Sequence, residues 1–228
     1  MTTAPAPYPR VAHLAGGRGT SDDKVLSETD RARLLGSPVA IEEKLDGANV
    51  VLWLDDHVVR CALRSGPGGA DRAGQLGPLR AWIAENNGAL VGVLGDEPLG
   101  LYAEWLLLTH TVAYDRLPSY LVVLDLRHGD GSFVSVDERN ERCERFGLAS
   151  PPELWRGVPG SIEAVEARLG RSQVGSHDAE GLVVRSLRAD ADPRLAKVWR
   201  PGFSPLPDLE WSRGRPRNQL ADAEASWH

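Results

Sequence analysis

The sequence has 228 residues, of which 42% are hydrophobic and 25% charged, values typical of a globular protein that buries a core of its own. Its apolar runs fall well short of the roughly 18 residues that span a membrane, and its N-terminus lacks the basic region and apolar stretch of a signal peptide, so we expect a cytoplasmic protein. The formal net charge of −6 excludes a general coat for nucleic acid, since phosphate contacts need basic side chains, and restricts nucleic-acid binding to a local basic groove.

The first predicted elements are strands around a turn. Residues 39–45 and 50–54 are apolar runs, and the turn-forming cluster 46–49 between them favours a β-hairpin or a sharp junction of two strands. A third run at 58–63 then predicts an antiparallel meander. A glycine-rich loop over 64–69 follows, in which the backbone can approach a ligand closely.

Three helices are predicted from apolar spacing and from residues that begin or end helices. A helix over 79–86 is expected to stop at Gly88. Residues 135–147 contain a capping box, in which Glu138 follows the first residue by three positions, and end at a glycine. The third predicted helix covers residues 161–169.

The remaining predicted strands are short and are not spaced as parallel strand–helix–strand units. They cover residues 101–108, 120–126, 181–184 and 195–199. This order predicts an α+β fold with antiparallel sheets flanked by helices. We expect one folding domain over residues 1–203, which includes the N-terminal segment, and a polar C-terminal tail over 204–228.

Lysine is rare in this chain, since only three of its 26 lysine and arginine residues are lysines, namely Lys24, Lys44 and Lys197. Arginine could replace lysine as a charge but not as a nucleophile, because the guanidinium does not lose its proton. Lys44 begins the sequence Lys44-Leu45-Asp46-Gly47, and the alternation of a strand would put Asp46 on the same side as Lys44. A solvated strand end is the alternative interpretation of this short motif.

Several later apolar runs each contain one charged residue. These residues are Glu104, Asp125, Glu180 and Lys197. Because burying an unpaired charge is costly, such residues indicate convergence on a polar site or a metal. Taken singly, each is equally consistent with an edge strand whose charge faces water.

The ordered series from Lys44 to Phe203 resembles the motifs of the covalent nucleotidyltransferases, the superfamily of ATP-dependent RNA ligases, DNA ligases and RNA capping enzymes. It is most similar to the compact bacterial and phage RNA ligases, in stretches at 19–26, 112–120 and 197–203. The resemblance implies the nucleotidyltransferase (ligase adenylation) fold. No OB-fold domain is expected, since residues 201–228 are too few for a five-stranded barrel of roughly 70 residues.

By this resemblance the catalytic set is Lys44, Asp46, Glu180 and Lys197. Lys44 would attack the α-phosphate of ATP, and Lys197, with Arg200, would neutralise charge as pyrophosphate leaves. Two glutamates near an amine would raise its pKa, so we infer that Glu104 and Glu180 hold Mg²⁺, or Mn²⁺, directly or through water.

The remaining nucleotide-binding residues also follow from the resemblance. Glu104 would meet the ribose hydroxyls, Glu43 the adenine edge, Arg64 the ribose or a 5′-phosphate, and Asn49 a water of the metal. Simple solvation for Arg64 and Glu43, and a turn-forming role for Asn49, are the alternatives. Two departures stand out: Leu124 occupies the position where an aromatic ring often covers adenine, and Trp199 replaces a second lysine.

The implied function is an ATP-dependent RNA ligase that seals 5′-phosphate and 3′-hydroxyl RNA ends through a lysyl-AMP and an adenylated RNA. Its partners would be RNA ends and a separate end-healing kinase or phosphatase. The alternatives are a DNA strand ligase of the same superfamily and a nucleotide- or RNA-end-binding module without turnover. The departures at Leu124 and Trp199 leave the binding module open. His13 and Lys24 are further candidates for contact with the triphosphate or the RNA end, with surface solvation as the alternative.

Overall fold

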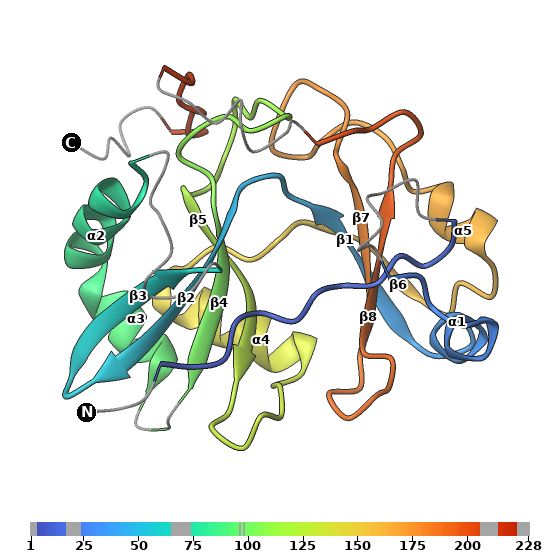
Figure 1. Ribbon diagram of the computed structural model, residues 1–228, viewed down its shortest axis with the longest axis horizontal. Helices are drawn as coiled ribbons and strands as arrows, with labels where there is room; N and C mark the ends of the chain where they lie inside the picture. Colours follow the sequence, from blue (N-terminus) through green and yellow to red (C-terminus); the bar gives the residue numbers. More distant parts are fainter. Residues whose placement is uncertain are drawn as a thin grey trace.

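The computed structural model describes residues 4–16, 24–64, 74–95, 97, 99–205 and 214–222. Within them the chain forms two four-stranded antiparallel sheets (Figure 1). The first, sheet A, has the order β6-β1-β7-β8 and consists of β6 (Glu153–Gly157), β1 (Val39–Lys44), β7 (Gly181–Ser186) and β8 (Leu195–Trp199). The second, sheet B, has the order β3-β2-β4-β5 and consists of β3 (Val58–Leu63), β2 (Ala48–Asp55), β4 (Gly100–Trp105) and β5 (Leu121–Arg127). The predicted α+β class with antiparallel sheets is confirmed.

Helices cover each sheet and close its hydrophobic core. Buried side chains of α1 (Glu28–Leu35) and α5 (Ile162–Glu166) pack against sheet A, and those of α2 (Leu76–Glu85), α3 (Asn87–Leu94) and α4 (Val136–Phe146) pack against sheet B. The sequence analysis did not predict α1, α3 or β6. No helix among the described residues is long and apolar enough to cross a membrane.

The chain passes from one sheet to the other between β1 and β2. The prediction of a hairpin here, and of a three-stranded meander, is wrong; the sharp strand junction is correct. β1 is buried at five of its six positions and pairs with β6 and β7, so both of its edges are occupied by strands from later in the chain. The turn chemistry of residues 46–49 indicates a change of direction but not the sheet in which the next strand lies.

A tight hairpin does join β2 and β3. Asp56 and His57 have φ of 48° and 64°, the left-handed conformation that two-residue hairpin turns use to match strand twist. The prediction that Gly88 stops a helix is wrong, since Gly88 lies in α3. A helical glycine costs only about 1 kcal/mol, and α3 offsets this cost by burying three apolar side chains.

The capping box before α4 has the predicted geometry. The Ser135 side chain accepts a hydrogen bond from the Glu138 backbone N–H, and Gly147 ends the helix in the left-handed conformation with φ of 71°. These local signals fixed both ends of the helix.

Buried ion pairs join the two sheets. On the sheet A side, Arg185 donates from Nε to Glu42 Oε2 at 2.9 Å and from Nη1 to Asp125 Oδ2 of β5 at 2.6 Å. Arg194 donates to the same aspartate at 2.6 Å, and Arg139 of α4 pairs with the other oxygen of Glu42. We call Glu42, Asp125, Arg139, Arg185 and Arg194 the buried ion network.

The N-terminal segment, residues 4–16, runs across both sheets (Figure 1). At sheet B, Tyr102 donates its hydroxyl hydrogen to the Ala6 carbonyl at 2.6 Å, and the Tyr8 hydroxyl donates to Asp125. At sheet A, the Lys197 N–H donates to the Ala12 carbonyl at 2.9 Å. The segment is therefore fixed to a strand of each sheet.

Part of the predicted tail packs against the domain. Asn218, in the segment 214–222, is 2% exposed and donates to the Leu106 carbonyl at 2.8 Å. Its side-chain oxygen accepts hydrogen bonds from the Tyr114 N–H and the Thr109 hydroxyl, both at 2.9 Å. This segment supports the loop that follows β4, which in turn contacts the candidate site.

Candidate active site

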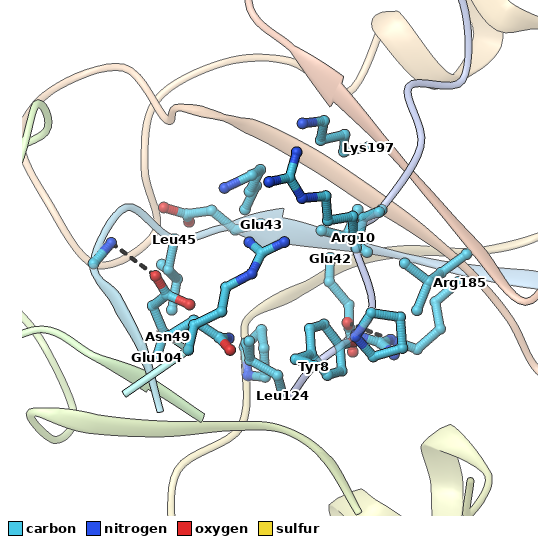
Figure 2. A pocket seen from close by; sticks show the side chains of 18 of the residues that line it. Tyr8, Arg10, Glu42, Glu43, Leu45, Asn49, Glu104, Leu124, Arg185 and Lys197 are labelled. Atoms are coloured by element: carbon cyan, nitrogen blue, oxygen red, sulfur yellow. Dashed lines mark hydrogen bonds and ion pairs between the residues drawn. The ribbon is translucent and has the colours of Figure 1, made fainter. Parts of the chain in front are cut away.

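A cavity of about 780 Å³ opens beside Lys44, lined by residues of both sheets and of the N-terminal segment (Figure 2). Its lining includes most of the residues predicted from the sequence, namely Glu43, Lys44, Asn49, Arg64, Glu104, Leu124 and Lys197. Of the other predicted residues, Glu180 contacts Lys44 directly, whereas Asp46 and Arg200 are not among the lining residues. The structure thus brings together residues that lie more than 150 positions apart in the sequence.

Lys44 is the last residue of β1, next to the crossing between the sheets. Its Nζ donates a hydrogen bond to Glu180 Oε2 at 2.7 Å. Burial acts to lower the pKa of this amine, but the negative charges of Glu180 and Glu104 outweigh burial, and the pKa is raised. The amine is therefore an ammonium at neutral pH, and it becomes a nucleophile only when another positive charge offsets the two carboxylates.

Glu104 faces the turn that follows Lys44. Its Oε1 accepts a hydrogen bond from the Gly47 N–H at 3.0 Å, and the Asn49 side chain also hydrogen-bonds to it. A Cβ at Gly47 would lie 2.6 Å from the Trp105 carbonyl oxygen and 2.9 Å from Glu104 Cγ. Only glycine therefore lets this turn lie so close to β4.

The two carboxylates beside Lys44 share one electrostatic environment. Burial raises the pKa of Glu104 and of Glu180 to about 7 in each case, and the Lys44 charge opposes the rise. Each is also affected by the nearby charge of Asp46. Near neutral pH this cluster can exchange protons or accept a cation.

The carboxylates of Glu104 and Glu180 are candidate ligands for a divalent metal ion. The described part of the chain holds no group of three or more His, Cys, Asp or Glu side chains that could hold a metal alone. Mg²⁺ is commonly bound through one or two carboxylates together with substrate phosphate oxygens. Glu104 and Glu180 fit that mode, in which the cation and the phosphates bind together.

Asp46 fixes the backbone beside the site. Its Oδ2 accepts hydrogen bonds from the N–H groups of Thr111 and Val112, at 2.6 and 2.8 Å, and its own N–H donates to the Tyr114 hydroxyl at 2.8 Å. The side chain holds the loop after β4 against the turn that follows Lys44. A direct catalytic role for Asp46 stays a prediction.

Glu43 forms part of the cavity wall and is 2% exposed. Its carboxylate accepts hydrogen bonds from the Ser172 hydroxyl at 2.5 Å and from the Gln173 N–H at 2.7 Å. Burial raises the pKa of this carboxyl group, and the two hydrogen bonds oppose the rise. The predicted contact with an adenine edge would have to share these oxygens with the 172–173 loop.

The predicted phosphate-binding cations have different positions. Lys197 lines the cavity from β8, with its Nζ 4.7 Å from the centre of the Trp199 ring. Arg64 lines it from the end of β3, where its backbone N–H donates to the Asn49 carbonyl at 3.0 Å. The Arg200 guanidinium lies over the Phe203 ring, 5.4 Å from its centre, so the structure does not bring it to the cavity.

Leu124 lies on the sheet B side of the cavity (Figure 2). Arg139 of the buried ion network donates to the Leu124 carbonyl at 2.7 Å, which fixes the backbone at that position. Val183 and Leu195 of sheet A also line the cavity. A flat apolar group at this wall would thus find aliphatic neighbours, and the aromatic rings in the lining come from other positions, Tyr8 and Trp199.

The sequence analysis missed some lining residues. Residues 8–11 come from the N-terminal segment, whose short proline-flanked pattern gives no local signal for a binding site. Arg185 also lines the cavity. As a charge inside the apolar strand β7 it carries the same signal that identified Glu104, and it could have been found in that way.

Comparison with protein families gives one clear match. The family model described as RNA ligase matches residues 37–199, which is most of the chain. No curated protein matches the sequence.

Solved structures of similar fold include RNA ligases of Naegleria gruberi. Its RNA ligase with pyrophosphate has a TM-score of 0.58 and 16% identity over 87% of this chain and 59% of that one. A lysine variant of that ligase with ATP and Mn has a TM-score of 0.56 and 17% identity over 86% and 62% of the two chains. A variant described as RNA ligase R4a, without ligand, has a TM-score of 0.54 and 18% identity over 86% and 61%. At this identity the likeness shows the fold, and the chain spans less than two thirds of these relatives.

Proposed function

The chain belongs to the RNA ligase family, and from that premise we propose that it is an ATP-dependent enzyme that joins 5′-phosphate and 3′-hydroxyl ends of RNA. One observation carries the proposal: Lys44 lines the cavity, its Nζ lies 2.7 Å from Glu180 Oε2, and Glu104 lies near enough to raise the pKa of the amine. A lysine beside two carboxylates that can hold a divalent cation, in a cavity with further basic residues, suits attack on a phosphoanhydride.

In the first step the Lys44 nitrogen attacks the α-phosphorus of ATP. A phosphorus–nitrogen bond forms, the bond to the oxygen that bridges the α- and β-phosphates breaks, and pyrophosphate leaves with that electron pair. The amine's proton passes to water, which reaches the site because 25% of the Lys44 side chain is exposed. Lys197 neutralises charge on the phosphates.

A divalent cation, Mg²⁺ or Mn²⁺, held by Glu104, Glu180 and phosphate oxygens would supply the positive charge that lets the amine lose its proton. Without the cation, Glu180 and Glu104 keep Lys44 protonated, so the amine cannot attack phosphorus in the free enzyme. Asn49 and the Gly47 N–H hold the Glu104 carboxylate in place.

The second and third steps move AMP and then release it. An oxygen of the RNA 5′-phosphate attacks the AMP phosphorus, the phosphorus–nitrogen bond breaks, and Lys44 regains a proton. The RNA 3′-hydroxyl oxygen then attacks the 5′-phosphorus and AMP leaves. Arg64, at the exposed end of β3, is positioned for the RNA 5′-phosphate or the ribose.

The adenosine would lie on the aliphatic wall. Leu124 and Val183 supply apolar surface, Glu43 a polar edge, and Glu104 an acceptor for ribose hydroxyls. The similar RNA ligases from N. gruberi were solved with ATP and Mn and with pyrophosphate, which supports ATP as the nucleotide and a divalent ion as the metal. The reaction would serve RNA repair in the cytoplasm, with a separate kinase or phosphatase that prepares the ends.

The test compares matched strands. We would incubate the protein, ATP and Mg²⁺ with a 5′-phosphorylated RNA and with the DNA of the same sequence, each with a 3′-hydroxyl. We expect joined RNA from the wild type and none from Lys44→Ala. Preferential joining of DNA would instead support the DNA ligase alternative, and ATP binding without any joining or adenylate would support a binding module.

A further inference from the structure

Two basic residues of the cavity lie outside the region that the family model matches. Arg10 and Lys24 both line the cavity, and both precede residue 37, where the match begins. The other cavity-lining cations are Lys44, Arg64, Arg185 and Lys197. Arg10 and Lys24 thus bring two basic side chains to the cavity from the N-terminal part of the chain.

The position of Arg10 is set by contacts on both sides of it. Two residues before it, the Tyr8 hydroxyl donates to Asp125 of sheet B. Two residues after it, the Ala12 carbonyl accepts from the Lys197 N–H of sheet A at 2.9 Å. Arg10 therefore spans the gap between two anchored points and is held over the cavity.

Lys24 is tied to the same segment. The His13 N–H donates to the Lys24 carbonyl at 2.7 Å, and the neighbouring Leu14 N–H donates to the Lys197 carbonyl at 2.9 Å. The segment at His13 and Leu14 thus lies between the backbone of Lys24 and β8. Both Lys24 and Arg10 line the cavity and are exposed to solvent.

Arg10 and the backbone of Lys24 lie near β8, the strand that carries Lys197. Figure 2 shows the side chains of Arg10 and Lys197 on the same side of the cavity, away from Leu124 and Glu104. If the base and ribose lie against Leu124 and Glu104, the α-phosphate lies at Lys44. The outer phosphates then extend towards Lys197 and the mouth of the cavity.

We infer that Arg10 and Lys24 bind the β- and γ-phosphates of ATP and hold the departing pyrophosphate. This inference rests on the function proposed above. The guanidinium and the ammonium donate hydrogen bonds to phosphate oxygens, so that the bond from the α-phosphorus to pyrophosphate lies opposite the Lys44 nitrogen. The N-terminal segment thereby supplies part of the triphosphate site, from outside the region of the family match.

The test measures binding of a triphosphate against a monophosphate. The probes are an ATP analogue with methylene in place of the α–β bridging oxygen, and AMP, each with Mg²⁺. In Arg10→Ala/Lys24→Ala we expect the dissociation constant of the analogue to rise about tenfold, since charge-assisted hydrogen bonds are lost, and that of AMP to change less than about twofold. Arg188→Ala, which removes an exposed arginine that pairs with nearby Asp190, is the control and should leave both constants unchanged.

A second measurement separates the nucleotide from RNA. The double variant should seal chemically pre-adenylated RNA at the wild-type rate, because that step releases AMP and no inorganic pyrophosphate, and should form the Lys44 adenylate at a higher ATP concentration than the wild type. Equal losses for AMP and the analogue, an unchanged constant for the analogue, or a defect confined to sealing would each overturn the inference. If the wild type itself forms no adenylate, the proposed function fails instead.

Discussion

At the scale of single residues, the site is a lysine restrained by two glutamates. Lys44 keeps its proton because the charges of Glu180 and Glu104 outweigh the effect of burial, whereas burial raises the pKa of each glutamate to about 7 against the opposing charge of Lys44. The free protein thus holds the Lys44 amine in its protonated form, which cannot act as a nucleophile. Activation depends on what enters the cavity.

The raised pKa of Glu104 makes folding stability depend on pH. A carboxyl whose folded pKa lies above its unfolded value stabilises the protein below the unfolded value, and this contribution is lost as pH rises through about 7. Without metal or nucleotide, we expect the free energy of unfolding of the wild type to fall between pH 4.5 and 7 by about 1–3 kcal/mol more than that of Glu104→Gln. In Glu104→Gln, the new side-chain amide oxygen can still accept the hydrogen bond from the Gly47 N–H.

Urea denaturation at a series of pH values measures this difference. Lys44, Glu180, Asp46 and Asn49 face Glu104 and are unchanged in the variant. Glu85→Gln, at the exposed end of α2, serves as the control and should follow the wild type. Parallel curves for the wild type and Glu104→Gln would contradict the assigned pKa.

At the scale of elements, the buried ion network sets how the two sheets meet. Arg139 is 1% exposed, pairs with Glu42 of β1 and donates to the Leu124 carbonyl of β5. It therefore links α4 to both walls of the cavity. Removing one member of a buried pair leaves an unbalanced charge, which costs far more than loss of a surface pair.

We expect Arg139→Met to lower the free energy of unfolding by about 3–5 kcal/mol, because Glu42 keeps only Arg185 as a partner. Arg142→Met, one turn away in the same helix, removes a partly exposed pair with Glu138 and should cost about 1 kcal/mol or less. Equilibrium urea unfolding compares the two variants. Similar losses for both would show that the network contributes no more than surface charge pairs.

Local elements could be predicted from the sequence where short-range chemistry decides them. The capping box at Ser135 and the strand at 195–199 are examples, since neighbouring residues determine the cap and the alternation. The crossing after Lys44 could not be predicted in this way. The partners of β1 are β6 and β7, which lie far along the chain, and no local pattern specifies them.

At the scale of the whole molecule, the site exists only when both sheets and the N-terminal segment meet. Lys44 ends β1 of sheet A and Glu180 directly precedes β7 of the same sheet, whereas Glu104 and Leu124 lie in sheet B. The buried charges in apolar strands predicted that these residues converge, and the resemblance to a family assigned their roles. The lining by residues 8–11 was not predictable, because it depends on where the segment is anchored in three dimensions.

The central claim is that Lys44 carries AMP covalently during the reaction, and labelling tests it most directly. We would mix the protein with α-labelled ATP and Mg²⁺, denature it, and locate the label by peptide mass spectrometry, with Lys44→Arg as the charge-matched control. We expect one AMP on Lys44, bound through an acid-labile phosphorus–nitrogen bond, and no label on Lys44→Arg. AMP on another residue, label retained by Lys44→Arg, or an unlabelled wild type that still joins RNA would contradict it.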